Sequence, residues 1–148
     1  MLSALLSKKG DGMEQVTVKR ISIITPDAGE PETLSGEWVG ALRATGDELL
    51  LTFTEPVEGG KVFNRVSFRD GTLTVDRRGA ASFRVVFRAG ETVSSVLSIP
   101  PLSLELPVST EEVLLLPTAV GIGFRVRFTS VAGEERRKNE MTLTATPL

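Results

Sequence analysis

The dipeptide Asp70-Gly71 limits the fold of this chain more than any other feature of the sequence. Two-residue hairpin turns of type I′ need a positive φ at both central residues, which an Asp-Gly pair accepts readily. A turn here pairs Arg69 with Thr72 and, further along both strands, Asn64 with Arg77. One face of the hairpin is then apolar, and the other is polar with opposite charges facing each other. Since a shift of one residue would destroy both patterns, the sequence defines the register of this hairpin.

The same inner face continues beyond the hairpin. A second turn at residues 79–81 places Phe83 opposite Arg77, and residues 48–90 as a whole predict four consecutive antiparallel strands. Most of the chain after Met13 also alternates apolar and polar residues with a period of two, between breaks at Gly, Pro or Asp. About nine or ten short strands with hairpin spacing indicate an all-β fold, either an antiparallel sandwich or a barrel.

The first predicted strand changes face part of the way along. Val16 and Val18 lie on one face of this strand, whereas Ile21 and Ile23 lie on the other. Such a switch predicts a β-bulge at Lys19-Arg20, and a bulge would bend the strand as barrel closure requires.

The second predicted strand, residues 33–44, carries the single tryptophan of the chain. Trp38 shares a face with Gly40 and Leu42, and we expect it to be a core anchor rather than a platform for a ligand. Gly36 and Gly40 have no side chain, which predicts sharp coiling of the strand or the close approach of another strand.

The residue types that are missing restrict the chemistry. The 148 residues include no Cys, His or Tyr. Disulfides and Cys-based metal sites are therefore excluded, and the commonest metal ligand and the usual general base at neutral pH are absent. We expect no catalysis, no metal and no cofactor. The net charge of −2 gives no electrostatic reason to expect a membrane or a nucleic acid as partner.

A single domain is expected at residues 13–148, because this length suits one hydrophobic core. Residues 1–12 are expected to be a flexible extension. Their apolar residues precede Lys8 and Lys9, which reverses the order found in a secretory signal. No stretch approaches the ~20 apolar residues of a helix that spans a membrane. We therefore expect a cytoplasmic protein, either a monomer or a homodimer.

Four segments of the chain form a distinctive series: LLLTFTEP, VSFRDGTLTVDRRG and SFRVVFRAG, followed by PPLSLELPVST. They resemble segments of the YwiB-like bacterial proteins of unknown function. The resemblance covers nearly all of residues 13–148 and includes an acid at a strand end (Glu55), an Arg-x-Gly strand end (Arg77 to Gly79) and Asn139 before the last strand. It implies a calycin-like or lipocalin-like β-barrel in meander order, and no established activity.

Glu55, Asn64 and Arg77 are predicted to form a polar row inside an apolar wall. Because burying a lone charge is costly, we expect the acid and the arginine to pair. Three interpretations stay open: an ion pair that closes one end of the barrel, an arginine that anchors an anionic ligand, or a glutamate that acts as a general base with a raised pKa. The residues predicted for the inner site are Arg77, Glu55, Asn64, Phe53, Phe83, Phe87 and Trp38.

The opposite face of the same strands is basic. Between Gly59 and Gly90 there are seven basic residues and two acidic ones. Asp76 is expected between two of the arginines. The pattern suits either a solvated β-face or a surface that binds phosphate or an acidic partner. The residues predicted for this face are Arg65, Arg69, Arg84 and Arg88.

The sequence thus predicts a non-catalytic barrel that binds a small anionic or amphipathic ligand in its interior. The alternative is a protein-interaction module that uses the basic outer face, for an acidic protein partner, or an exposed edge strand. We do not expect nucleic acid as a partner, because the basic face lacks the exposed aromatic side chains on which bases stack.

Overall fold

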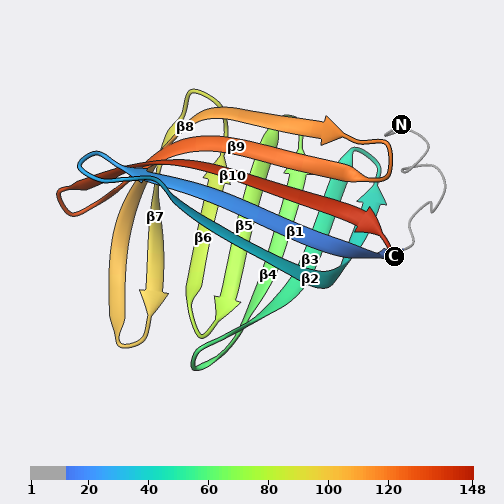
Figure 1. Cartoon of the computed structure of the whole chain (residues 1–148), viewed down its shortest axis with the longest axis horizontal. Coiled ribbons are helices and arrows are strands. Elements are labelled where there is room, and N and C mark those ends of the chain that lie inside the picture. The colour runs from blue at the N-terminus through green and yellow to red at the C-terminus, as the bar shows by residue number, and fades with distance from the viewer. Residues whose placement is uncertain (1–12) are drawn as a thin grey trace.

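The fold is a closed antiparallel β-barrel of ten strands, seen in a computed structural model that describes residues 13–148 (Figure 1). Each strand pairs with the next one in the sequence, and the last pairs with the first, which confirms the predicted all-β meander. The described residues contain no helix long and apolar enough to cross a membrane. The strands are β1 (Met13–Pro26), β2 (Glu32–Thr45), β3 (Glu48–Val57), β4 (Gly60–Arg69), β5 (Thr72–Gly79), β6 (Ser82–Phe87), β7 (Thr92–Ile99), β8 (Leu102–Pro117), β9 (Ile122–Ala132) and β10 (Glu135–Pro147).

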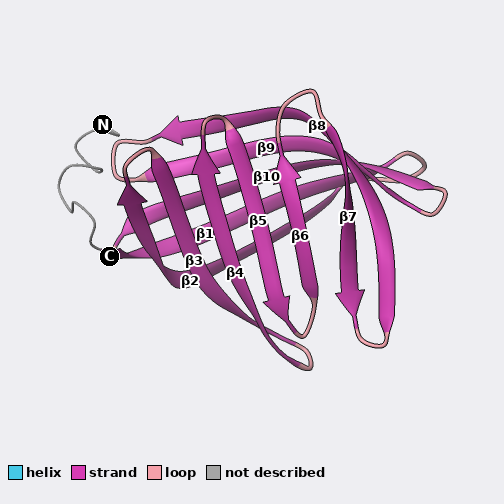
Figure 2. Ribbon diagram, turned by 180° about the vertical axis from the view of Figure 1, so that it is seen from behind, coloured by secondary structure: helices cyan, strands magenta, loops and turns pink. Residues whose placement is uncertain are grey.

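The register predicted from Asp70-Gly71 is confirmed. These two residues have φ values of 50° and 72°, as a type I′ turn requires. Asn64 pairs with Arg77 across β4 and β5, and Arg77 pairs with Phe83 across β5 and β6. The four strands β3–β6 therefore present one continuous inner face, and they run beside one another in Figure 2.

The β-bulge predicted in the first strand is wrong. β1 pairs without interruption with both β2 and β10, and period two holds along its whole length. Arg20 consequently faces inward beyond Val16 and Val18, and Ile21 and Ile23 face outward with 48% and 37% of their surfaces exposed. The prediction failed because it assumed that two isoleucines must be buried, although single apolar side chains are common on protein surfaces.

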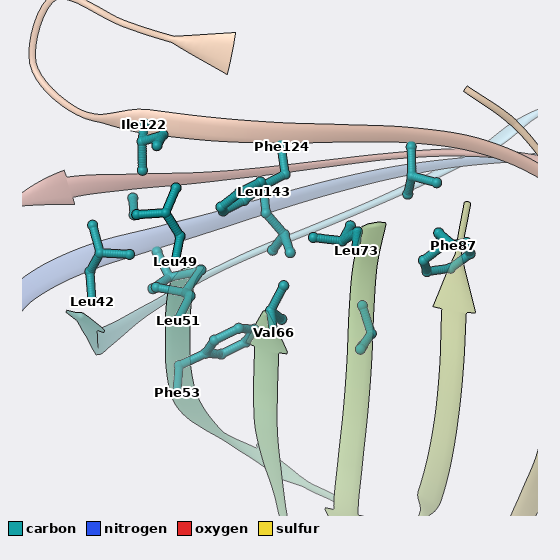
Figure 3. Packing of buried hydrophobic residues seen from close by; sticks show 14 of the residues in the cluster. Leu42, Leu49, Leu51, Phe53, Val66, Leu73, Phe87, Ile122, Phe124 and Leu143 are labelled. Atoms are coloured by element: carbon teal, nitrogen blue, oxygen red, sulfur yellow. The ribbon is translucent and has the colours of Figure 1, made fainter. Parts of the chain in front are cut away.

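One end of the barrel is closed by apolar side chains. This closed end carries the β2–β3, β4–β5, β6–β7 and β8–β9 connections and the end of β10 (Figure 1). Figure 3 shows side chains from both walls meeting there. Each fully buried Leu, Ile or Phe contributes about 1.5–3 kcal/mol relative to an exposed position. The buried hydrophobic residues include Leu42, Leu49, Leu51, Ile122, Phe124 and Leu143.

The strand pairing is less complete at the other end of the barrel. This end carries the β1–β2, β3–β4, β5–β6, β7–β8 and β9–β10 connections. β6 and β7 share only two residue pairs, and β9 pairs with β8 only from Val108 onward. Residues 102–107 of β8 therefore form a free edge, which suits the predicted position of Pro107. Leu102 and Leu104 lie on this edge with 72% and 45% of their surfaces exposed. We call the end of the barrel that carries these five connections the open end.

Candidate ligand-binding site at the open end

The polar row predicted inside the barrel is present. Arg77 donates from Nη2 to Glu55 Oε1 (3.0 Å) and from Nε to Asn64 Oδ1 (3.1 Å). Asn64 Nδ2 in turn donates to Glu55 Oε1 (3.1 Å). Glu55 and Asn64 are buried, with 8% and 1% of their surfaces exposed. The asparagine thus links the two charged residues and has both ends of its amide occupied.

A second arginine completes this group, and it was not predicted. Arg20 Nη1 lies 3.2 Å from Glu55 Oε1, and Arg20 Nη2 lies 2.9 Å from Glu55 Oε2. Two parallel hydrogen bonds of this kind form a strong and well-oriented ion pair. Arg20 comes from β1 and reaches Glu55 on β3 across the intervening β2. We call Arg20, Glu55, Asn64 and Arg77 the polar cluster.

Gly36 and Trp38 on β2 make this reach feasible. Gly36 pairs with Arg20, and a side chain at Gly36 would collide with the Trp38 ring, which occupies that space. The Arg20 guanidinium lies over the Trp38 ring, 4.8 Å from its centre, in cation–π geometry. Trp38 also stacks on Phe53, with 5.1 Å between ring centres. The tryptophan is thus a packed support for Arg20, in line with the expected core anchor.

Gly40, the other glycine beside Trp38, has a different role. A Cβ there would collide with the backbone oxygen of Thr52 on β3 and would lie 3.0 Å from side-chain atoms of Val18 and Phe53. The close approach of a neighbouring strand that the sequence predicted is therefore observed at this position.

The polar cluster keeps Glu55 ionised. Burial alone would raise the pKa of Glu55, but the hydrogen bonds and positive charge of Arg20, the charge of Arg77 and the hydrogen bond from Asn64 together lower it. The general-base hypothesis required a raised pKa and is wrong. Two guanidinium groups share one carboxylate, so the polar cluster retains one positive charge.

An apolar cavity of about 210 Å³ lies beside the polar cluster. The predicted site residues Arg77, Asn64, Phe53, Phe83 and Phe87 line it, whereas Glu55 and Trp38 do not. The remaining lining residues are Arg20, Ser22, Ile24, Leu34, Val66, Val75, Val85, Phe128, Met141 and Leu143. The side chain of Arg77 is 31% exposed and that of Arg20 is 21% exposed, so the charge lies at the rim of the cavity.

The basic outer face also has the predicted register, with Asp76 between Arg65 and Arg84. The carboxylate of Asp76, however, pairs with Arg78 on its own strand (3.3 Å). The other two predicted arginines are occupied by acids at turns. Arg69 lies 3.5 Å from Asp47, and Arg88 lies 3.2 Å from Glu91. Within residues 13–148, no group of three or more acidic side chains is placed to hold a metal ion.

Comparisons with known proteins agree with this fold. The crystal structure of ywiB protein from Bacillus subtilis matches with a TM-score of 0.83 and 21% sequence identity, over 92% of this chain and 93% of that one. The crystal structure of Ail, the attachment invasion locus protein of Yersinia pestis, matches with 9% identity over 93% of this chain and 99% of that one. Its TM-score of 0.36 is too low to indicate a shared fold.

No curated protein matches the chain. Residues 16–143, which include every member of the polar cluster and nearly the whole barrel, match the family model described as a domain of unknown function, DUF1934. The chain belongs to the DUF1934 family.

Proposed function

We propose that the open end of the barrel binds a small amphipathic anion. The observation that carries this proposal is the unbalanced positive charge of the polar cluster at the rim of an apolar cavity. A single Glu55–Arg77 pair would be neutral and would give an anion no reason to bind. With Arg20 added, a ligand carboxylate would bring the group to neutrality.

The two arginines have different parts in this proposal. Arg20 directs both terminal nitrogens at Glu55 and stacks on Trp38, so its guanidinium is held in place. Arg77 uses Nε and Nη2, and within residues 13–148 its Nη1 has no hydrogen-bond partner. Arg77 therefore contacts the ligand head group, and Arg20 supplies the charge that keeps Glu55 from neutralising Arg77.

The cavity sets the size of the apolar part. Sites for drug-sized ligands occupy about 300–1,000 Å³, and the cavity of about 210 Å³ is smaller. Its floor and walls are Phe, Val, Leu and Met side chains. This suits a short aliphatic chain or a single ring that carries one carboxylate.

Native mass spectrometry of the protein purified from its own host is the first test. We expect a small co-purifying mass that is absent from Arg77→Met and retained in Arg78→Met. The control removes the same charge from the next residue, which faces outward. A protein that purifies without any small mass, or that loses it equally in both variants, would count against the proposal.

Calorimetry with hexanoate and 1-hexanol supplies the second test. Hydrogen bonds to charged groups contribute about 1.5–3 kcal/mol, so hexanoate affinity should fall roughly 10- to 100-fold in Arg77→Met. 1-Hexanol should bind weakly to both proteins. Equal affinities for the acid and the alcohol would show that the arginine has no part in binding.

A protein-interaction role is the second candidate, and the free edge of β8 favours it. Residues 102–107 offer unpaired backbone groups beside the exposed Leu102 and Leu104, a combination to which an extended segment of another protein can add as a strand. Replacing Leu104 by Lys would weaken capture of such a partner and leave hexanoate binding unchanged. Unchanged capture of the partner by Leu104→Lys would exclude the free edge of β8 as its binding site.

A further inference from the structure

We propose a second binding site, for a phosphate group, on the outer face of β4, β5 and β6. This site is separate from the cavity, because successive residues of a strand point to opposite faces of the sheet. Arg65, Asp76 and Arg84 form one row across the three strands, and Ser67 and Thr74 form the next.

The charge of this row is unbalanced. Asp76 is the carboxylate of the row, and Arg78 occupies it through Nε (3.4 Å) and Nη2 (3.3 Å). Within residues 13–148, neither Arg65 nor Arg84 has a carboxylate oxygen within 4 Å of its guanidinium. Three arginines thus surround one carboxylate, and two of them are free to bind an anion.

The shape of the face brings these groups together. Arg65, Ser67, Thr74, Asp76, Arg78 and Arg84 line a depression of about 360 Å³. Neighbouring strands lie about 4.8 Å apart, so the backbones of Arg65 and Arg84 are about 10 Å apart and their long side chains can converge above β5. The hydroxyl groups of Ser67 and Thr74 add two short donors at one side of the depression.

This set of donors suits phosphate. A guanidinium group presents paired N–H donors that match two oxygens of a phosphate, and it keeps its charge at every accessible pH. Two such groups approaching from opposite sides, with hydroxyl donors between them, can contact most oxygens of one phosphate group. A single carboxylate has too few oxygens to use all of these donors.

The neighbouring arginines of the same face provide a contrast. Arg69 lies near Asp47 and Asp70, and Arg88 is held by Glu91 and donates from Nε to Thr72 (3.1 Å). Arg69 lies on β4 with Arg65, and Arg88 directly follows β6, the strand of Arg84. Both carry the same charge as Arg65 and Arg84, but their guanidinium groups are already occupied. Arg88→Gln is therefore a matched control.

Titration of the full chain with pyrophosphate at low ionic strength tests the site. We expect saturable binding, weakened about tenfold or more by Arg65→Gln or Arg84→Gln and changed less than twofold by Arg88→Gln. Asp76→Asn should tighten binding, because it removes the opposing carboxylate and releases Arg78. Unchanged melting temperatures would show that these exposed substitutions leave the fold intact.

Two results would overturn the site. Absence of saturable binding is one. The other is equal weakening by Arg65→Gln and Arg88→Gln, which would mean that pyrophosphate senses only the net charge of the face. Arg77→Met should leave pyrophosphate affinity unchanged, so the outcome is independent of hexanoate binding in the cavity.

Discussion

The two ends of the barrel use the same strands for different purposes. At the closed end, residues such as Leu51, Ile122 and Phe124 leave at most 1% of their surfaces exposed. At the open end, inward positions of the strands carry Arg20, Asn64 and Arg77, beside a cavity that apolar side chains leave unfilled. Packing is thus concentrated at one end and charge at the other.

This difference separates the region that stabilises the fold from the region proposed to bind a ligand. A well-packed interior contributes most to the free energy of folding, because it removes the largest apolar area from water. A charged group at a cavity rim contributes less, since its desolvation offsets much of its electrostatic gain. The closed end can therefore stabilise the fold while the open end keeps an unbalanced charge and an empty volume.

Two phenylalanines on β9 should show the largest contrast. Phe124 is 1% exposed at the closed end, and Phe128 is partly exposed where it lines the cavity. We expect Phe124→Ala to lower the free energy of unfolding by about 3–5 kcal/mol, and Phe128→Ala by about 1–2 kcal/mol. Urea denaturation of both variants measures the difference. Equal losses would show that the two ends are packed alike.

Removing the shared carboxylate should have the next largest effect. Glu55→Gln leaves Arg20 and Arg77 without an acid, and we expect a loss of about 2–3 kcal/mol in the free energy of unfolding. This is below the usual value for a fully buried pair, because both arginines are partly exposed. Glu58→Gln, in the β3–β4 connection, is the control and should cost less than about 0.5 kcal/mol. If Glu55→Gln also cost less than about 0.5 kcal/mol, the polar cluster would contribute nothing to folding.

Acid should remove the contribution of ionised Glu55 to the free energy of unfolding. The pKa of Glu55 in the folded protein lies below its ordinary value of 4.5, so ionised Glu55 favours the folded state above pH 4.5. The contribution is lost as the pH falls below 4.5 and through the lower folded pKa. The difference in melting temperature between the unaltered protein and Glu55→Gln should therefore be constant near neutral pH and shrink in acid. A difference that grows in acid would contradict a lowered pKa.

Gly36→Ala should have a smaller effect on stability than Phe124→Ala or Glu55→Gln. The added methyl group must displace the Trp38 ring, which Phe53 and Arg20 hold on other sides, at a cost of about 1–2 kcal/mol. Trp38 is the single tryptophan, so a shift in its fluorescence maximum reports its movement directly. We also expect weaker hexanoate binding, because Arg20 loses its support. An unchanged fluorescence maximum would show that the added methyl group fits without moving the Trp38 ring.

Local sequence was sufficient for the part of the site that lies on adjacent strands. Asp70-Gly71 defines the register of β4 and β5, which places Asn64 beside Arg77. The alternation along β3 puts Glu55 on the same inner face, near both of them. The partner of Asp76 could also have been found, because Asp76 and Arg78 are two residues apart and share a face of β5.

Arg20 could not be placed in the same way. Its partner is two strands away, and their meeting depends on the missing side chain of Gly36 and on the position of the Trp38 ring. Continuing period two from Val16 and Val18 would have turned Arg20 inward, but the outward isoleucines obscured that signal. The cavity could not be predicted either, because its volume depends on how side chains from eight strands pack together.

The open end is proposed to bind a small amphipathic anion, whereas the closed end stabilises the fold. Amide and methyl NMR spectra of the labelled protein during hexanoate titration test it most directly. We predict saturable shifts at the Asn64 side-chain amide and at Leu34 and Val85, none at Leu42 or Ile122, and no saturable shifts in Arg77→Met. Shifts scattered over the surface, or shifts that persist in Arg77→Met, would contradict the claim.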